Sequence, residues 1–223
     1  MRHAFAFTTV FFVATSGSCA QENQATPVTD FFIARTSQTF SPSVPGYRLG
    51  EFFRMYGSWI GPDCGYIDFG KATLYREVFC GGGKMLHGGK RLTLIEEFYF
   101  DQASGPTAKS ANYFQPWTFV QVNFSKKLTS ETVYFPYLPL NHTATIQHVL
   151  EHAKVEYRIG HRWKVGVGYA LYKFGNEPRQ DKPFVTVTRE TERWGAVELW
   201  PYQKIPTGAQ MQLRYSLSHK HSS

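Results

Sequence analysis

The stretch "WKVGVGYALYKF", Trp163 to Phe174, alternates two kinds of side chain along its length. Large apolar residues occupy one parity, and small or polar residues occupy most of the other: Trp163, Val165, Val167, Tyr169 and Leu171 against Lys164, Gly166, Gly168, Ala170 and Tyr172. A period of two residues places these sets on opposite faces of a β-strand. The stretch therefore predicts a long strand that separates an apolar environment from a polar one.

Segments with the same period follow one another through the chain, with turn residues between them. Several of them run well beyond the roughly 5 to 6 residues of an average globular strand. We therefore predict an all-β fold, a single antiparallel up-and-down barrel of about 12 strands, with 8 or 10 as alternatives. The expected strands are 28–36, 47–58, 64–70, 73–86, 91–101, 111–124, 129–137, 150–159, 162–174, 183–191, 194–201 and 208–218.

The connections between these strands alternate in length through the second half of the chain. Short connections are followed by long ones, at 87–90, 102–110, 125–127, 138–149, 160–161 and 175–183. Barrels that cross a membrane have short turns at one end and longer loops at the other. An even number of strands then places both ends of the chain at the short-turn end.

The first residues have the pattern of a secretory signal peptide, in which a basic Arg2 precedes the apolar run 4–14 and small residues lead to Ala20. Cleavage after Ala20 removes Cys19, although Cys19 is also the residue that a lipid anchor would modify. The predicted organisation is a signal peptide at 1–20, a membrane barrel at 21–218 and a short polar tail at 219–223.

The composition suits strands that face lipid on one side and water on the other. Aromatic residues make up 17% of the chain, yet its mean hydropathy is −0.34. After the signal peptide, no apolar run approaches the roughly 20 residues that a membrane helix needs. The net charge is +7, but the basic residues are scattered, so a nucleic-acid partner is not expected.

Two cysteines, Cys64 and Cys80, remain after cleavage. In an exported protein such a pair is predicted to form a disulfide. The segment between them reads as two strands folded about 70–73, which would bring the cysteines opposite each other. Two unpaired buried thiols are the alternative.

Apolar and polar residues also alternate around Val155 and Leu213, but alternation alone leaves open which face points inward. A membrane barrel turns its apolar face to lipid, whereas a soluble lipocalin-like barrel turns it inward around a small apolar ligand. We favour the membrane barrel because Gly166 and Gly168, on the polar face, suit an interior crowded with long charged side chains. The predicted interior residues are Lys154, Glu156, Arg158, Glu198, Gln210, Gln212 and Arg214.

Aromatic residues near the strand ends are predicted to lie at the membrane interfaces. Trp163 follows a short turn, and Tyr134 and Tyr137 lie beside a long loop. One strand departs from the general pattern. In "LTLIEEFYF", 92–100, one of the two adjacent glutamates must share a face with leucine and phenylalanine, which is unfavourable against lipid.

With its signal peptide, "WKVGVGYALYKF" and the final "AQMQLRYSLS", the chain resembles outer-membrane β-barrel proteins of Gram-negative bacteria. The resemblance implies an outer-membrane location, contact with outer-membrane lipid, assembly by the barrel assembly machinery, and small solutes as candidate cargo. Such proteins commonly end on an aromatic residue, whereas "HKHSS" follows Leu217 here. An assembly signal would therefore lie around Tyr215 and Leu217.

The residues predict no catalytic site, no cofactor and no metal site. The favoured function is a narrow pore or an envelope scaffold, depending on whether the interior charges leave a path or fill it. The enzyme alternative is a lipid-directed acyl hydrolase, because outer-membrane barrels include such enzymes and the chain offers histidines for a nucleophile–base pair: His87, His142, His148, His152 and His161. The oligomeric state stays open.

Overall fold

The computed structural model describes residues 29–40, 48–68, 76–105, 110–191, 195–202 and 210–222, and for 29–40, 48–49, 53–56, 195, 201–202 and 210–222 it describes the backbone alone. These residues form twelve strands: β1 (Thr29–Phe40), β2 (Arg48–Tyr56), β3 (Trp59–Asp68), β4 (Arg76–Gly88), β5 (Leu92–Ser104), β6 (Ala111–Asn123), β7 (Leu128–Pro139), β8 (Gln147–Arg158), β9 (Trp163–Phe174), β10 (Gln180–Thr191), β11 (Gly195–Tyr202) and β12 (Gln210–Ser222). In the described part of the chain, no helix is long and apolar enough to cross a membrane.

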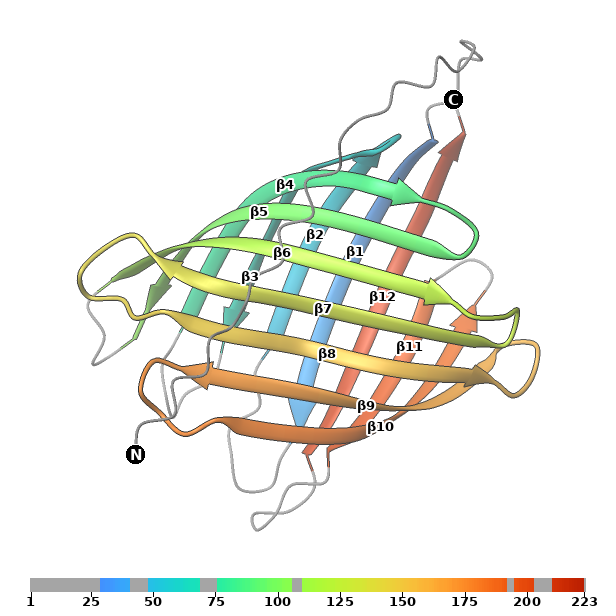
Figure 1. The fold of residues 1–223 in the computed structure, drawn as a ribbon. Coiled ribbons are helices and arrows are strands. Elements are labelled where there is room, and N and C mark those ends of the chain that lie inside the picture. Colours follow the sequence, from blue (N-terminus) through green and yellow to red (C-terminus); the bar gives the residue numbers. More distant parts are fainter. Residues whose placement is uncertain are drawn as a thin grey trace.

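Each strand pairs antiparallel with its neighbours in the chain, and β1 also pairs with β12, which closes the sheet (Figure 1). The prediction of an all-β up-and-down barrel is confirmed, and the described residues supply the larger of the expected strand numbers. Closure matters physically, because it leaves no sheet edge with unpaired backbone N–H and C=O groups.

The two ends of the barrel differ in the length of their connections. Short connections at 57–58, 89–91, 124–127 and 159–162 lie at the end where β1 begins and β12 finishes, toward the upper right of Figure 1. Longer ones, such as 140–146, lie at the opposite end. We call these the short-turn end and the long-loop end.

Strand pairing extends further toward the C-terminus than the sequence predicted. In the register of β1 and β12, His219 lies opposite Phe32 and Ser222 lies opposite Thr29. The prediction of a tail beginning at 219 is therefore wrong for residues 219–222. β1 begins early enough to supply backbone partners for them, and polar residues are tolerated at a strand end. The predicted signal peptide, 1–20, lies outside the described residues.

The strand quoted first, β9, has the two faces that its alternation predicts. Val167 is 63% exposed on the outside of the barrel, whereas Ala170 is fully buried inside. Neighbouring β8 also has its apolar face outside and its polar face inside, because Val155 is exposed while Lys154 and Glu156 are buried. A lipocalin-like arrangement, with the apolar face inward, is therefore excluded for this wall.

Gly166, on the inner side of β9, allows a close approach to β8. A Cβ atom there would lie 2.1 Å from the backbone oxygen of Val155, whereas a Cβ at Gly160, in the turn, would meet nothing within 4 Å. We expect Gly166→Ala to lower the free energy of unfolding by about 1 to 3 kcal/mol, as overpacking does. Gly160→Ala is the control. Denaturant midpoints of the two variants in detergent test this, and equal midpoints would contradict it.

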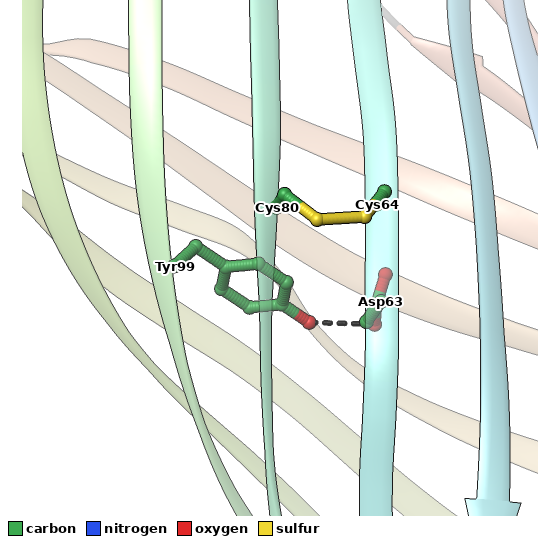
Figure 2. The surroundings of a disulfide bond; sticks show 4 residues. All are labelled: Asp63, Cys64, Cys80 and Tyr99. Atoms are coloured by element: carbon green, nitrogen blue, oxygen red, sulfur yellow. Dashed lines mark hydrogen bonds between the residues drawn. A yellow bond between two sulfur atoms is a disulfide. The ribbon is translucent and has the colours of Figure 1, made fainter.

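The predicted disulfide is present between Cys64 of β3 and Cys80 of β4, which lie opposite each other in the sheet (Figure 2). Cys80 is exposed, whereas its neighbour Phe79 is buried inside. The disulfide is therefore on the outer face. On the inner face beside it, the Tyr99 hydroxyl donates a hydrogen bond to Asp63 (Figure 2).

Removing this disulfide should destabilise the barrel without opening it. The bond joins residues 16 positions apart, and a loop of that size predicts a loss of about 3 kcal/mol when it is cut. The test compares the unfolding midpoint of the double variant Cys64→Ser/Cys80→Ser with that of the oxidised protein. An unchanged midpoint would mean that strand pairing alone fixes the β3–β4 register.

Candidate functional site

A network of charged side chains lies inside the barrel around Lys154 of β8. The Lys154 Nζ lies 2.6 Å from Glu198 Oε1 in β11, and 3.5 Å from carboxylate oxygens of both Glu131 in β7 and Glu156 in β8. Only 4% of the Lys154 side chain is exposed. Two strands separate β8 from β11 in the sheet. The Lys154–Glu198 ion pair therefore links strands that are not neighbours.

Small residues on β9 make this long reach feasible. Lys154 lies opposite Gly168 in the β8–β9 register, and Ala170 follows on the same inner face. Gly168 also leaves room for the ring of Phe184 in β10, since a Cβ there would lie 2.4 Å from that ring. The small residues of β9 thus provide the space that long side chains of β8 and β10 fill.

Hydroxyl groups of β10 complete the hydrogen bonding of this network. Thr186 and Thr188 each donate a hydrogen bond of 2.7 Å to Glu156 Oε1. Both threonines are buried. Burial of a carboxylate is costly unless charge and hydrogen bonds compensate for it. Here Glu156 receives both, from Lys154 and from the two threonines.

A β-bulge in β8 adds two further inward side chains. The β8–β9 register shifts between Leu150 and Ala153, so the two intervening residues do not alternate. Glu151 is 9% exposed and His152 is fully buried. The His152 Nε2 lies 2.7 Å from Glu131 Oε1. His152 therefore connects β7 to the same charged network.

Trp200 of β11 packs against the centre of the network. Its ring is fully buried and stacks on Phe184, with centroids 4.4 Å apart. Its indole Nε1 donates a hydrogen bond to Glu198, and the His152 ring packs edge-on at 5.1 Å. We refer to Lys154, Glu131, Glu156, Glu198, His152 and Trp200 as the interior network.

The inner face of β4 to β7 is filled differently, by aromatic rings. Trp117 stacks on Phe135 at 3.9 Å, and further rings surround this pair: Phe79, Tyr99, Tyr113 and Tyr137. Gln115 lies among them and donates hydrogen bonds to the carboxylates of Glu77 and Asp101. This wall is therefore aromatic, with isolated polar links, whereas the β7–β11 side carries the ion pairs.

Two solved porin structures share this barrel architecture. The chain is similar to the KdgM porin, at 11% identity and a TM-score of 0.56, over 84% of this chain and 98% of that one. It is also similar to the NanC porin, at 10% identity and a TM-score of 0.56, over 85% of this chain and all of that one. The chain has the porin barrel fold. No protein-family model and no curated protein matches the sequence.

Within this porin fold, the predicted interior residues fall into two groups. Lys154, Glu156 and Glu198 lie together in the interior network, and Arg158 pairs with Glu190 at 2.7 Å nearer the short-turn end. For the others only the backbone is described. In the register of β11 and β12 they lie opposite Tyr202, Trp200 and Glu198: Gln210, Gln212 and Arg214. Their interior role stays a prediction.

Of the three aromatic residues predicted at the membrane interfaces, two lie on the outer face and one lies inside the barrel. Trp163 and Tyr134 lie on the outer face, 44% and 38% exposed. Tyr137 is buried inside and donates a hydrogen bond of 2.7 Å to Glu77, so its predicted interface position is wrong. The reason is the spacing, because residues three apart on a regular strand face opposite sides.

Several interior residues were not among those predicted from the sequence, notably Trp117, Gln115 and His152. The sequence does carry a signal for Trp117 and Gln115. Gln115 is polar and lies between Tyr113 and Trp117 on one parity of β6, and a polar residue there indicates that this parity faces inward. A signal existed for His152 as well, since it shares one parity of β8 with Lys154 and Glu156, which are buried inside. Among the described residues, no group of three or more His, Cys, Asp or Glu side chains is arranged to hold a metal ion.

Proposed function

We propose that this chain is an integral outer-membrane barrel that forms a narrow pore for small polar solutes, constricted at the interior network. The observation that carries the proposal is the distribution of polarity in a closed barrel. Lys154 and its carboxylates are buried inside, while Val155, Val167 and Val185 are exposed outside. Such a surface suits lipid, and such an interior suits hydrated solutes.

The ends of the barrel support a membrane position. At the short-turn end, Trp163 on the outer face lies under the guanidinium of Arg189, 5.5 Å from the ring centroid. Toward the long-loop end, Phe100 is exposed and packs on Phe114. Aromatic residues at both interfaces are typical of membrane barrels. The short-turn end would face the periplasm.

The solute class rests on the chemistry of the interior. The KdgM porin has also been solved in complex with an oligogalacturonate, which supports a small, polar solute as the cargo of this fold. In this chain, Lys154 lies among three carboxylates, and Thr186 and Thr188 add hydroxyl groups. These groups can exchange hydrogen bonds with a polyhydroxylated or charged solute, but not with an apolar one.

An envelope scaffold is the second candidate, and one observation favours it. Four large interior side chains are fully buried: Tyr99, Gln115, His152 and Trp200. Side chains that line a wide water-filled channel would be exposed to that water. The interior is therefore tightly filled at these positions, and a plugged barrel would serve by its outer surface or its loops.

Conductance in a planar lipid bilayer separates the two candidates. The purified barrel is expected to give stepwise currents of one small unit size, because the interior network leaves a narrow path. Heat-dependent gel mobility of the same preparation verifies that the barrel is closed. Persistently silent bilayers from closed barrels would overturn the pore and leave the scaffold.

A further inference from the structure

The outer face of β4 to β7 carries a row of polar side chains. In the sheet register, Lys84 lies opposite Glu96, Glu96 lies opposite Thr118, and Thr118 lies opposite Tyr134. Residues directly opposite in neighbouring strands share a face. That face is the outer one, since Phe98, on the same parity as Glu96, is half exposed, whereas Tyr99 is buried inside. We call these four residues the polar row.

The side chains of the polar row make a few local contacts, one between two members of the row and two with residues beside it. Thr118 donates a hydrogen bond of 3.1 Å to Glu96 Oε2. The Lys84 Nζ lies over the ring of Trp59, 4.8 Å from its centroid. Tyr134 shares a hydrogen bond of 2.8 Å with His148. Among the described residues, no ion pair involves Lys84 or Glu96, and the Lys84 side chain is exposed.

Glu96 lies within the apolar band and not at its margin. On the outer parity of β5, Leu92 and Leu94 precede it, and Phe98 and Phe100 follow it. At about 3.4 Å per residue and a tilt of about 40°, it lies roughly 10 Å from the start of β5, inside an apolar band about 25 Å tall. A charge at this depth is unfavourable against lipid alone.

The outer face of β9 and β10 offers a direct comparison. The middle of the outer face of β9 and β10 carries Val165 and Val167 on one strand, and Val185 and Val187 on the other. Charged residues on that face lie near the strand ends, as Arg189 does beside Trp163. The polar row therefore has no counterpart on the described outer face of β9 and β10, and a row confined in this way is the pattern expected of a contact surface.

We propose that a second copy of this chain docks on the outer face of β4 to β7, so that Lys84 of each copy pairs with Glu96 of the other. The proposal rests on the membrane position put forward above. A two-fold axis parallel to the barrel axis places the row of each copy against that of the other at the same depth. Lys84 and Glu96 lie side by side, so the surface is complementary to itself.

Charge complementarity distinguishes this occupant from lipid. Lipid acyl chains carry no charged group at this depth, so they leave Lys84 without an anion and Glu96 without a cation. A second copy supplies a cation to Glu96 and an anion to Lys84 in one contact, and it is itself a closed barrel that tolerates the hydrocarbon region. One dimer contact therefore compensates both charges.

Cysteine cross-linking in the outer-membrane fraction tests the contact. Leu94 lies two residues from Glu96 on the same face, and Val167 lies on the outer face of β9, four strands away. With an added oxidant, Leu94→Cys is expected to give a covalent dimer, and Val167→Cys is expected to stay monomeric. Equal cross-linking of the two variants would indicate random collision and overturn the proposal, as would the absence of any Leu94→Cys dimer.

A charge exchange tests the ion pair itself in the Leu94→Cys background. Lys84→Glu or Glu96→Lys alone sets like charges against each other and should lower the cross-linked fraction by about tenfold or more. The double exchange restores complementarity and should restore the dimer, and failure to do so overturns the Lys84–Glu96 pairing. A heat-dependent mobility shift is scored in every variant. A shift without a dimer rejects the dimer alone, whereas loss of the shift in the parent protein rejects the membrane barrel.

Discussion

Trp200→Ala is expected to raise the single-channel conductance several-fold. Trp200 is fully buried, and its ring fills the interior between Phe184, His152 and Lys154. The space that it leaves would be lined by charged and hydrogen-bonding groups. A polar cavity of that size fills with water, whereas an apolar one stays dry. The constriction should therefore widen into a hydrated path.

The matched control is Trp163→Ala, which removes the same side chain from the outer face of β9. Its conductance should equal that of the parent protein. Loss of a buried tryptophan also destabilises, by about 3 to 5 kcal/mol, so both variants must first show the heat-dependent mobility of a closed barrel. An unchanged conductance for closed Trp200→Ala would show that ions do not pass through the barrel at the position of Trp200.

Lys154→Met is expected to lower the free energy of unfolding by about 3 to 5 kcal/mol, because it removes one partner of a buried ion pair. Three carboxylates, those of Glu131, Glu156 and Glu198, lose the ammonium group that they share. Methionine keeps much of the length and apolar volume of the lysine stem. The loss therefore reports on charge and not on packing. Denaturant unfolding in detergent measures it.

A second substitution should reverse part of this loss. In Lys154→Met/Glu198→Gln, the carboxylate that lay 2.6 Å from the Lys154 Nζ is neutral, so the double variant is expected to be more stable than Lys154→Met alone. Lys127→Met, at an exposed position in a short turn, is the control and should change stability by less than about 0.5 kcal/mol. Similar losses for Lys154→Met and Lys127→Met would mean that the interior network contributes little.

Much of the fold follows from simple alternation. In β9, one parity holds the residues that prove exposed and the other holds Gly168 and Ala170. The strand count and the closed antiparallel order follow from repeated segments of that kind. The cysteines could be paired because two strands folded on one another place their midpoints together.

Alternation does not predict the inward face of a strand where both faces carry apolar residues, or where a bulge interrupts the period of two. In β5 and β6 aromatic residues occupy both faces, so apolarity alone does not say that Tyr99 points in while Phe98 points out. In β8 the bulge shifts the inward parity, so that the consecutive residues Glu151 and His152 both face inward. A single extra residue reverses every later assignment on a strand, and nothing in the local composition marks its position.

Contacts across the interior depend on closure and lie beyond local pattern. Tyr99 reaches Asp63 by crossing β4 at Gly81, which lies opposite both residues in the sheet. Lys154 reaches Glu198 across β9 and β10. The sequence does suggest the glycines as places where space is needed. Which side chain uses that space is decided by the curvature of the closed sheet.

Gel mobility of unboiled and boiled samples from a detergent-extracted outer-membrane fraction tests the central claim most directly. A closed membrane barrel resists unfolding in detergent at room temperature, so the unboiled protein should migrate differently from the boiled protein. The same fraction should hold the protein. A single mobility for both samples, with the protein recovered in the soluble periplasmic fraction, would contradict the membrane barrel and, with it, the proposed pore.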